Sequence, residues 1–97
     1  MLFIATCTDK PERLPLRQET RPAHLAYLEA LGGKVRAGGA LLTADQKTVI
    51  GSLLILEAET EAEARDWLAA DPYAKAGLFA NVDVKPWRQA AGVIKLA

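Results

Sequence analysis

The chain has 97 residues, of which 51% are apolar and 25% charged, and its 12 basic residues balance 12 acidic ones. This length matches one domain, residues 1–97, and leaves no room for a second core. The apolar content excludes a disordered chain, and the lack of a basic excess argues against nucleic acid as the main partner. The single cysteine, Cys7, excludes an intramolecular disulfide and a cysteine-based zinc site.

No apolar run approaches the roughly 20 residues that a membrane-spanning helix needs. The apolar start of the chain has no basic segment before it and no cleavage site of small residues after it, so it does not resemble a signal peptide. We therefore expect a soluble, cytoplasmic protein without a membrane partner.

The first expected element is a buried strand over residues 2–7, which are almost all apolar. Pro11 and Pro15 argue against one long helix from residue 10, so we expect the first helix to begin near Thr20. The pair Gly32-Gly33 ends this helix.

Residues 34–42 and 49–57 are predicted to be two strands of a hairpin, joined by the polar connection 43–48. The first of these strands is interrupted at Gly38-Gly39, which suggests a bulge. The second is apolar on both sides over Leu53–Leu56, so both of its faces favour burial.

Thr60 is the expected cap of a second helix, and Glu63 completes a capping box. That helix should end at Asp71, because Pro72 disfavours a helical conformation at the residue before it. Alternating residues over 81–87 predict a last strand, and residues 93–94 a short C-terminal edge strand.

The element order β-α-β-β-α-β predicts an α+β fold, the ferredoxin-like split arrangement, with both helices on one face of a mostly antiparallel four-stranded sheet. The other face would stay bare although Leu53–Leu56 makes it apolar. We therefore expect a homodimer in which two sheets pack face to face.

His24 is the only histidine, and at about 100° per residue it shares one stripe of the first helix with Arg21 and Leu28. A buried imidazole needs a hydrogen-bonding partner. From the stripe alone, a structural core histidine and a functional one both remain open.

Asp71 leaves the end of the second helix along that helix's apolar stripe. It can serve as a cap beside Pro72. However, an acid at a helix C-terminus opposes the helix dipole, which suggests another partner. Since the two helices lie side by side in this fold, His24 and Asp71 can meet as a dyad in which the carboxylate fixes the tautomer of the ring.

Four segments carry a family resemblance: Arg21–Leu25 with Leu28, Gly51-Ser52, Asp71–Tyr73 with Ala76-Gly77, and Val82–Trp87. Over roughly residues 2–88 the chain resembles the YCII-related family. The resemblance implies a ferredoxin-like fold that dimerises into an α/β barrel, as in muconolactone isomerases and small antibiotic-biosynthesis monooxygenases.

The resemblance also implies an active site around a His–Asp pair, which corresponds to His24 and Asp71. The implied activity is lyase-, dehydrochlorinase- or isomerase-like acid–base chemistry on a small, often aromatic molecule, with no metal or organic cofactor. One departure is the short connection Thr43–Thr48, where longer members of the family have a loop that covers a pocket.

Three further polar residues are candidate substrate-binding groups. Arg21 can hold a carboxylate or phenolate, or pair with Asp71 or Glu19. Ser52 can bind a ligand or serve the strand structurally, and Tyr73 can line a pocket or pack in the core. With one histidine and no cysteine or carboxylate cluster, a metal site is not expected.

Two functions therefore remain open. In the first, His24 and Asp71 carry out acid–base catalysis while Arg21 stabilises negative charge. In the second, the chain is a non-catalytic dimeric module that binds a small ligand or another protein, and the dyad is structural. The first requires the dyad to lie at an accessible cavity.

Overall fold

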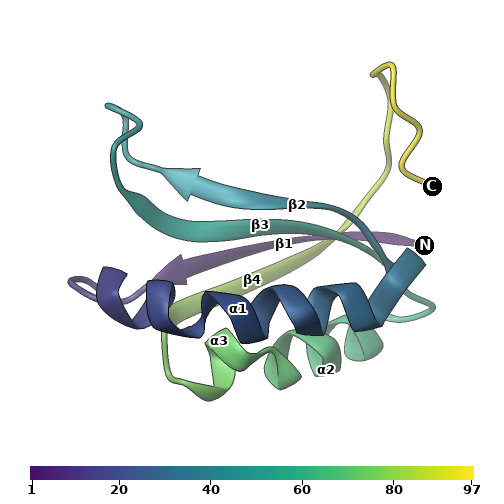
Figure 1. Cartoon of the computed structure of the whole chain (residues 1–97). Coiled ribbons are helices and arrows are strands. Elements are labelled where there is room, and N and C mark those ends of the chain that lie inside the picture. The colour runs from purple at the N-terminus through teal and green to yellow at the C-terminus, as the bar shows by residue number, and fades with distance from the viewer.

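The structure is a computed structural model that describes all residues, 1–97. Its elements in chain order are β1 (Leu2–Asp9), α1 (Leu14–Leu31), the 3-10 turn η1 (Gly32–Lys34), β2 (Val35–Leu42), β3 (Val49–Glu57), α2 (Glu61–Ala70), α3 (Pro72–Lys75) and β4 (Phe79–Trp87). The strands form one antiparallel sheet in the order β2-β3-β1-β4. All helices lie on one face of the sheet (Figure 1), which confirms the ferredoxin-like α+β fold.

The register of the sheet determines which side chains meet the helices. In β1, Phe3 lies opposite Leu56 of β3, and Ala5 lies opposite Leu54 of β3 and Val84 of β4. All five are buried in one core cluster, which Ala64 and Leu68 of α2 complete. Alternate residues of each strand point to the other face of the sheet.

The first helix is longer than the sequence predicted. It begins at Leu14, not near Thr20, and Pro15 lies in its first turn. Proline is tolerated there because the first N–H groups of a helix have no partner within the helix. The expected start near Thr20 was therefore wrong, although the helix does not begin as early as residue 10.

Pro22 lies inside α1 and removes one hydrogen bond from it. The carbonyl that loses its donor is that of Gln18, four residues earlier. Gln18 and Pro22 are both exposed, so this carbonyl is on the solvent side of the helix. The helix continues to Leu31 because its other face packs against the sheet.

The second helix agrees with the prediction. The hydroxyl of Thr60 accepts a hydrogen bond from the backbone N–H of Glu63, and α2 ends at Ala70, directly before Asp71. The carboxylate of Glu63 accepts from the N–H of Glu59 and so satisfies a second free donor at this end. Both bonds stabilise the start of α2.

The last ten residues form no strand, so the expected edge strand at residues 93–94 was wrong. Instead, Gln89 holds the segment in a loop: its amide donates to the carbonyl of Ile94, and its side-chain oxygen accepts from the N–H of Leu96. The segment rises from β4 on the sheet face opposite the helices (Figure 1). The side chains of Val93 and Ile94 are exposed there.

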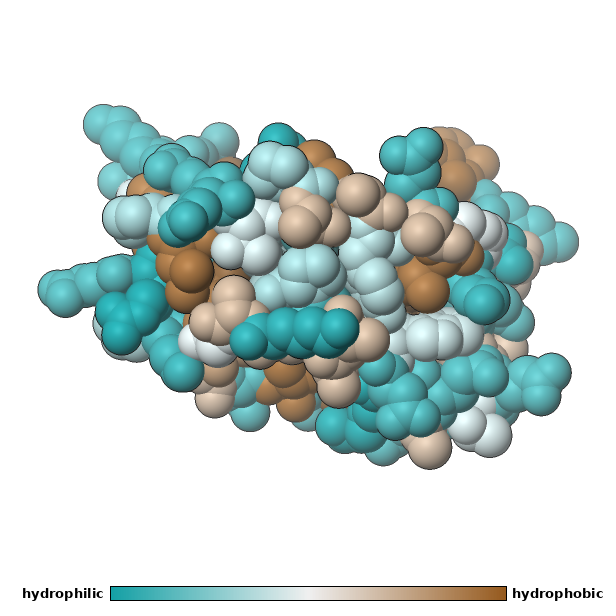
Figure 2. All heavy atoms as spheres, turned by 60° about the horizontal axis from the view of Figure 1, so that its bottom comes forward, coloured by the Kyte–Doolittle hydropathy of each residue, from teal (hydrophilic) through white to brown (hydrophobic).

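The outer face of the helices is mainly polar. Seen from the helix side, hydrophobic residues form only small separate groups among hydrophilic ones (Figure 2). No helix is both long and apolar enough to cross a membrane. The polar sides of α1 and α2 therefore face the solvent, and their buried sides face the sheet.

The strands β1 and β3 approach each other closely at Gly51, and a substitution there tests this approach. A Cβ atom at this position would overlap the backbone carbonyl oxygen of Cys7, which cannot move without disturbing the ladder between the two strands. We expect Gly51→Ala to lower the free energy of unfolding by about 1–3 kcal/mol. Urea unfolding measures this change.

Gly33→Ala is the matched control, because no heavy atom lies within 4 Å of a Cβ at Gly33. Its free energy of unfolding should stay within about 0.5 kcal/mol of that of the wild type. Equal effects of the two substitutions would contradict the close approach of the strands.

Cys7 lies in the core cluster and is 1% exposed. Burial raises the pKa of the Cys7 thiol to about 12, so the nucleophilic thiolate is scarce near neutral pH. We expect iodoacetamide at pH 8 to leave the folded chain unmodified, and to alkylate the same cysteine once the chain is unfolded in guanidinium chloride. Mass spectrometry distinguishes the two states, and rapid alkylation of the folded chain would contradict the burial.

Candidate active site

The structure brings together His24 of α1 and Asp71, which follows α2. His24 Nδ1 lies 2.8 Å from Asp71 Oδ2 and 2.9 Å from Oδ1. The two residues are only 7% and 2% exposed. An ionised carboxylate only accepts hydrogen bonds, so Nδ1 carries the proton of this contact and Nε2 is the ring nitrogen that Asp71 does not engage.

Asp71 has a second role as a helix cap. Its Oδ1 accepts a hydrogen bond of 2.9 Å from the backbone N–H of Tyr73, and Pro72 occupies the first position of α3. The acid therefore lies at the start of α3 as well as at the end of α2. This arrangement explains why an acidic residue is placed at the unfavourable end of the α2 dipole.

Tyr73 supports the ring of His24. The two rings are stacked with centroids 3.9 Å apart, and the guanidinium of Arg17 lies 4.5 Å from the Tyr73 centroid. Burial raises the pKa of the Tyr73 phenol, against the opposing charges of Arg17 and Arg21. Tyr73 is therefore a protonated donor at neutral pH as well as a packing surface.

A cavity of about 330 Å³ lies between α1 and the β2–β3 side of the sheet. Four of the five predicted site residues line it, and only Asp71 lies behind its wall. The lining residues are Arg17, Arg21, His24, Leu25, Leu28, Val35, Gly38, Gly39, Ala40, Ser52, Leu54 and Tyr73. The size is suitable for a small organic molecule.

His24 Nε2 has no hydrogen-bond partner within the chain. No fully buried side-chain nitrogen or oxygen lacks a partner, so this atom is open to solvent. Because His24 lines the cavity, solvent reaches Nε2 through it. The Tyr73 hydroxyl and the Arg17 guanidinium, which also belong to lining residues, interact with each other.

Arg17 was not among the site residues predicted from the sequence. This residue is 6% exposed, and its guanidinium forms a two-point ion pair with Asp9 at the end of β1, with Nε–Oδ2 and Nη2–Oδ1 distances of 2.6 and 2.8 Å. Nη2 also donates to the hydroxyl of Ser52 in β3, at 2.9 Å. Ser52 is thus a buried acceptor that helps to hold Arg17 in place.

A helical spacing was the signal that could have identified Arg17. Positions 17, 21, 24 and 28 are four, three and four residues apart, which places them on one face of a helix. Starting the helix near Thr20 left Arg17 in a predicted loop. The predicted stripe through positions 21, 24 and 28 was correct. It did not include position 17 because Pro15 was taken to delay the start of the helix.

Arg21 lines the cavity, where a substrate-binding group would lie, and is exposed. The alternative prediction, an ion pair with Asp71 or Glu19, is not found. Leu25 on the same stripe is 44% exposed. The stripe of α1 therefore borders a cavity at this point instead of packing against a filled core.

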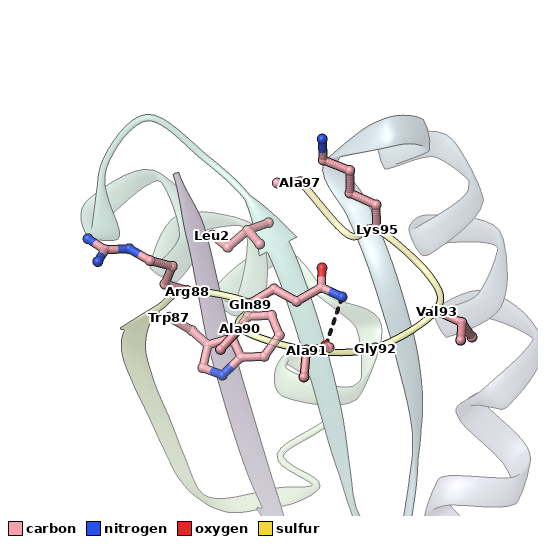
Figure 3. A pocket seen from close by; sticks show the side chains of 10 residues that line it. All are labelled: Leu2, Trp87, Arg88, Gln89, Ala90, Ala91, Gly92, Val93, Lys95 and Ala97. Atoms are coloured by element: carbon pink, nitrogen blue, oxygen red, sulfur yellow. Dashed lines mark hydrogen bonds between the residues drawn. The ribbon is translucent and has the colours of Figure 1, made fainter.

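A second and larger cavity, about 440 Å³, lies between Leu2, Trp87 and the C-terminal residues 88–97 (Figure 3). Its charged lining residues are Arg88 and Lys95, and Figure 3 shows both side chains pointing away from the centre of the pocket. No His, Asp or Glu lines it. Size alone therefore does not identify the reactive site. In the whole chain, no three His, Cys, Asp or Glu side chains come together as a metal site.

The family model of the YCII-related domain matches residues 1–88. Protein YciI of Escherichia coli O6:H1 is 35% identical over 96 residues, covering 92% of this chain and 98% of YciI. The protein named Derivative of benzaldehyde biosynthesis cluster protein C, from Emericella nidulans, is 38% identical over 74 residues, covering 68% of this chain and 76% of that protein.

Among solved structures, the 5-chloro-2-hydroxyhydroquinone dehydrochlorinase TftG from Burkholderia phenoliruptrix, in complex with 2,5-dihydroxybenzoquinone, is 42% identical. It superposes with a TM-score of 0.86 over 93% of this chain and 96% of TftG. A NIPSNAP domain protein from Burkholderia xenovorans shares the fold at 18% identity, with a TM-score of 0.56 over 98% of this chain and all of that one. The chain belongs to the YCII-related family.

Proposed function

We propose that this protein is a cofactor-independent, lyase-like enzyme that uses His24 and Asp71 for acid–base chemistry on a small, hydroxylated cyclic molecule. One observation carries the proposal: Asp71 holds Nδ1 of His24, so that Nε2 is directed to the solvent in the cavity. The similarity to the dehydrochlorinase TftG supports the reaction class.

The geometry suits a proton shuttle. With the Nδ1 proton held by Asp71, His24 Nε2 can take a proton from a substrate hydroxyl and return it to another atom of the same substrate. The carboxylate stabilises the imidazolium that forms between these two steps. Apolar walls around the ring, provided by Leu28 and Leu54, limit competition from bulk water.

The substrate of TftG illustrates the chemistry. Loss of HCl from 5-chloro-2-hydroxyhydroquinone requires a proton to leave a ring hydroxyl and a proton to be added at the carbon that bears chlorine. The C–Cl bond then breaks as a second hydroxyl proton leaves, and the ring becomes a hydroxybenzoquinone. The products are the quinone and HCl, so no external oxidant or reductant is needed.

Chloride release from 5-chloro-2-hydroxyhydroquinone tests the proposal. We expect turnover by the wild type and a fall of about 10²–10⁴-fold in kcat/KM for His24→Gln, because the shuttle nitrogen is lost. Asp71→Asn should lower kcat as well, since the amide no longer selects the Nδ1–H tautomer. Circular dichroism checks that each variant is folded.

Glu29→Gln is the control, because Glu29 is an exposed residue of α1 outside the cavity. Its kcat/KM should equal that of the wild type. Full activity of a folded His24→Gln variant would refute the role of His24. Binding of the quinol without chloride release would favour the non-catalytic ligand-binding module.

We also propose that two copies pack through the sheet faces that carry no helices. Ile4 and Leu53 point to that face and are only partly covered, and Leu2 and Ile55 lie beside them. An apolar sheet face of this kind favours burial against a second copy of itself.

Light scattering after size exclusion measures this association. The wild type at micromolar concentration should have twice the mass of one chain. Leu53→Lys should give a monomer, because it places a charge at the centre of the face. Ala62→Lys on the exposed side of α2 should leave the mass unchanged. A monomeric wild type would refute the dimer.

A further inference from the structure

We infer that the α1 cavity binds its ligand as an anion, with Arg17 as the anchor for one ionised oxygen on a small apolar body. This inference specifies the substrate class of the proposed enzyme, and in that respect it rests on the proposed function. The binding experiment that tests it does not require the protein to be an enzyme.

The charged groups of the cavity wall all have the same sign. Arg17 and Arg21 line the cavity, and no aspartate or glutamate does. Asp9, the carboxylate that pairs with Arg17, is not a lining residue. The Arg17–Asp9 pair therefore directs its donor end toward the ligand, and the charges nearest to a ligand in the cavity are positive.

Arg17 is fixed in a single orientation. Asp9 engages Nε and Nη2, and Ser52 accepts a further bond from Nη2. These contacts leave Nη1 as the guanidinium nitrogen that neither Asp9 nor Ser52 engages, and Arg17 lines the cavity. A donor that is already held in place loses little conformational entropy when it binds an anion.

Arg17 also stays positively charged in its buried position. Burial alone would weaken it, but the hydrogen bond and the negative charge of Asp9 raise the pKa of Arg17 above its ordinary value. Because the pair is buried, water screens the attraction between Nη1 and an anionic oxygen only weakly. Such a charge-assisted bond is stronger than one between neutral groups.

Arg21 adds a net charge at the opening. It is exposed, lines the cavity and makes no ion pair within the chain. It is therefore free to attract an approaching anion, whereas Arg17 holds it inside.

The rest of the wall selects an apolar body. Leu25, Leu28, Val35 and Leu54 line the cavity, and Gly38 leaves it open, since a Cβ there would lie 2.7 Å from Leu54 Cδ2. A small ring with an ionised hydroxyl or carboxyl group fits both halves of this wall.

Isothermal titration calorimetry at pH 7 tests the inference with two quinones that share one ring and differ in charge. The hydroxyls of 2,5-dihydroxybenzoquinone are vinylogous acids that ionise in neutral water, whereas 2,5-dimethoxybenzoquinone stays neutral. We expect the wild type to bind the ionised quinone at least about 10-fold more tightly. This comparison depends on no variant.

Two variants assign the preference to Arg17. Asp9→Asn/Arg17→Gln removes both charges of the pair together, so no buried carboxylate is left alone, and it should weaken binding of the ionised quinone about 10- to 100-fold. Arg17→Lys keeps the charge but loses the two-point contact with Asp9, and should give an intermediate loss. Arg13→Gln, at the cap position directly before α1 and outside this cavity, is the control and should bind as the wild type does.

Equal affinity of the wild type for the two quinones, no binding of the ionised one, or undiminished binding by the folded double variant would overturn the inference. Failure of the proposed function would be distinguishable from failure of this inference. His24→Gln should lose turnover but keep the preference for the ionised quinone. A wild type that releases chloride but shows no such preference would leave the role of the dyad intact and refute only the role of Arg17.

Discussion

The carboxylate of Asp71 connects three helical segments of this protein. It follows α2, accepts the backbone N–H that begins α3, and holds the imidazole of His24 on α1. Because the same oxygen pair orients the ring and starts the turn that carries Tyr73, the stacked rings and the dyad form as one unit. A shift of α1 relative to α2 and α3 would break the contact between His24 and Asp71, so the orientation of the ring depends on the packing of the helices.

The ion pair between Arg17 and Asp9 connects α1 to the sheet in a similar way. Asp9 at the end of β1 and Ser52 in β3 both engage Arg17, so α1 is tied to two adjacent strands close to the cavity. Burying charge is costly unless every charge is paired and hydrogen-bonded. Here the cost is offset by the two-point contact, and the carboxylates are kept behind the wall. No carboxylate therefore lines the cavity.

Local patterns predicted most of the architecture. The apolar run of β1, the capping box at Thr60 and the hairpin before it are short-range signals, and each gave an element close to its observed bounds. The start of α1 was missed because a local rule about Pro15 was applied where the proline falls in the first turn. The edge strand at residues 93–94 was wrong because the side chain of Gln89 binds the backbone of that segment.

For the candidate site, the sequence by itself determined that His24 and Asp71 lie on the inner stripes of two neighbouring helices, since helical periodicity places side chains on a face. It also indicated the apolar sheet face opposite the helices. Only the tertiary structure decided that Arg17 enters the cavity, that Ser52 serves to hold it, and that Arg21 stays unpaired at the opening. These roles depend on contacts between residues as far apart as Asp9, Arg17 and Ser52. Such contacts follow from how the elements pack, which no local pattern encodes.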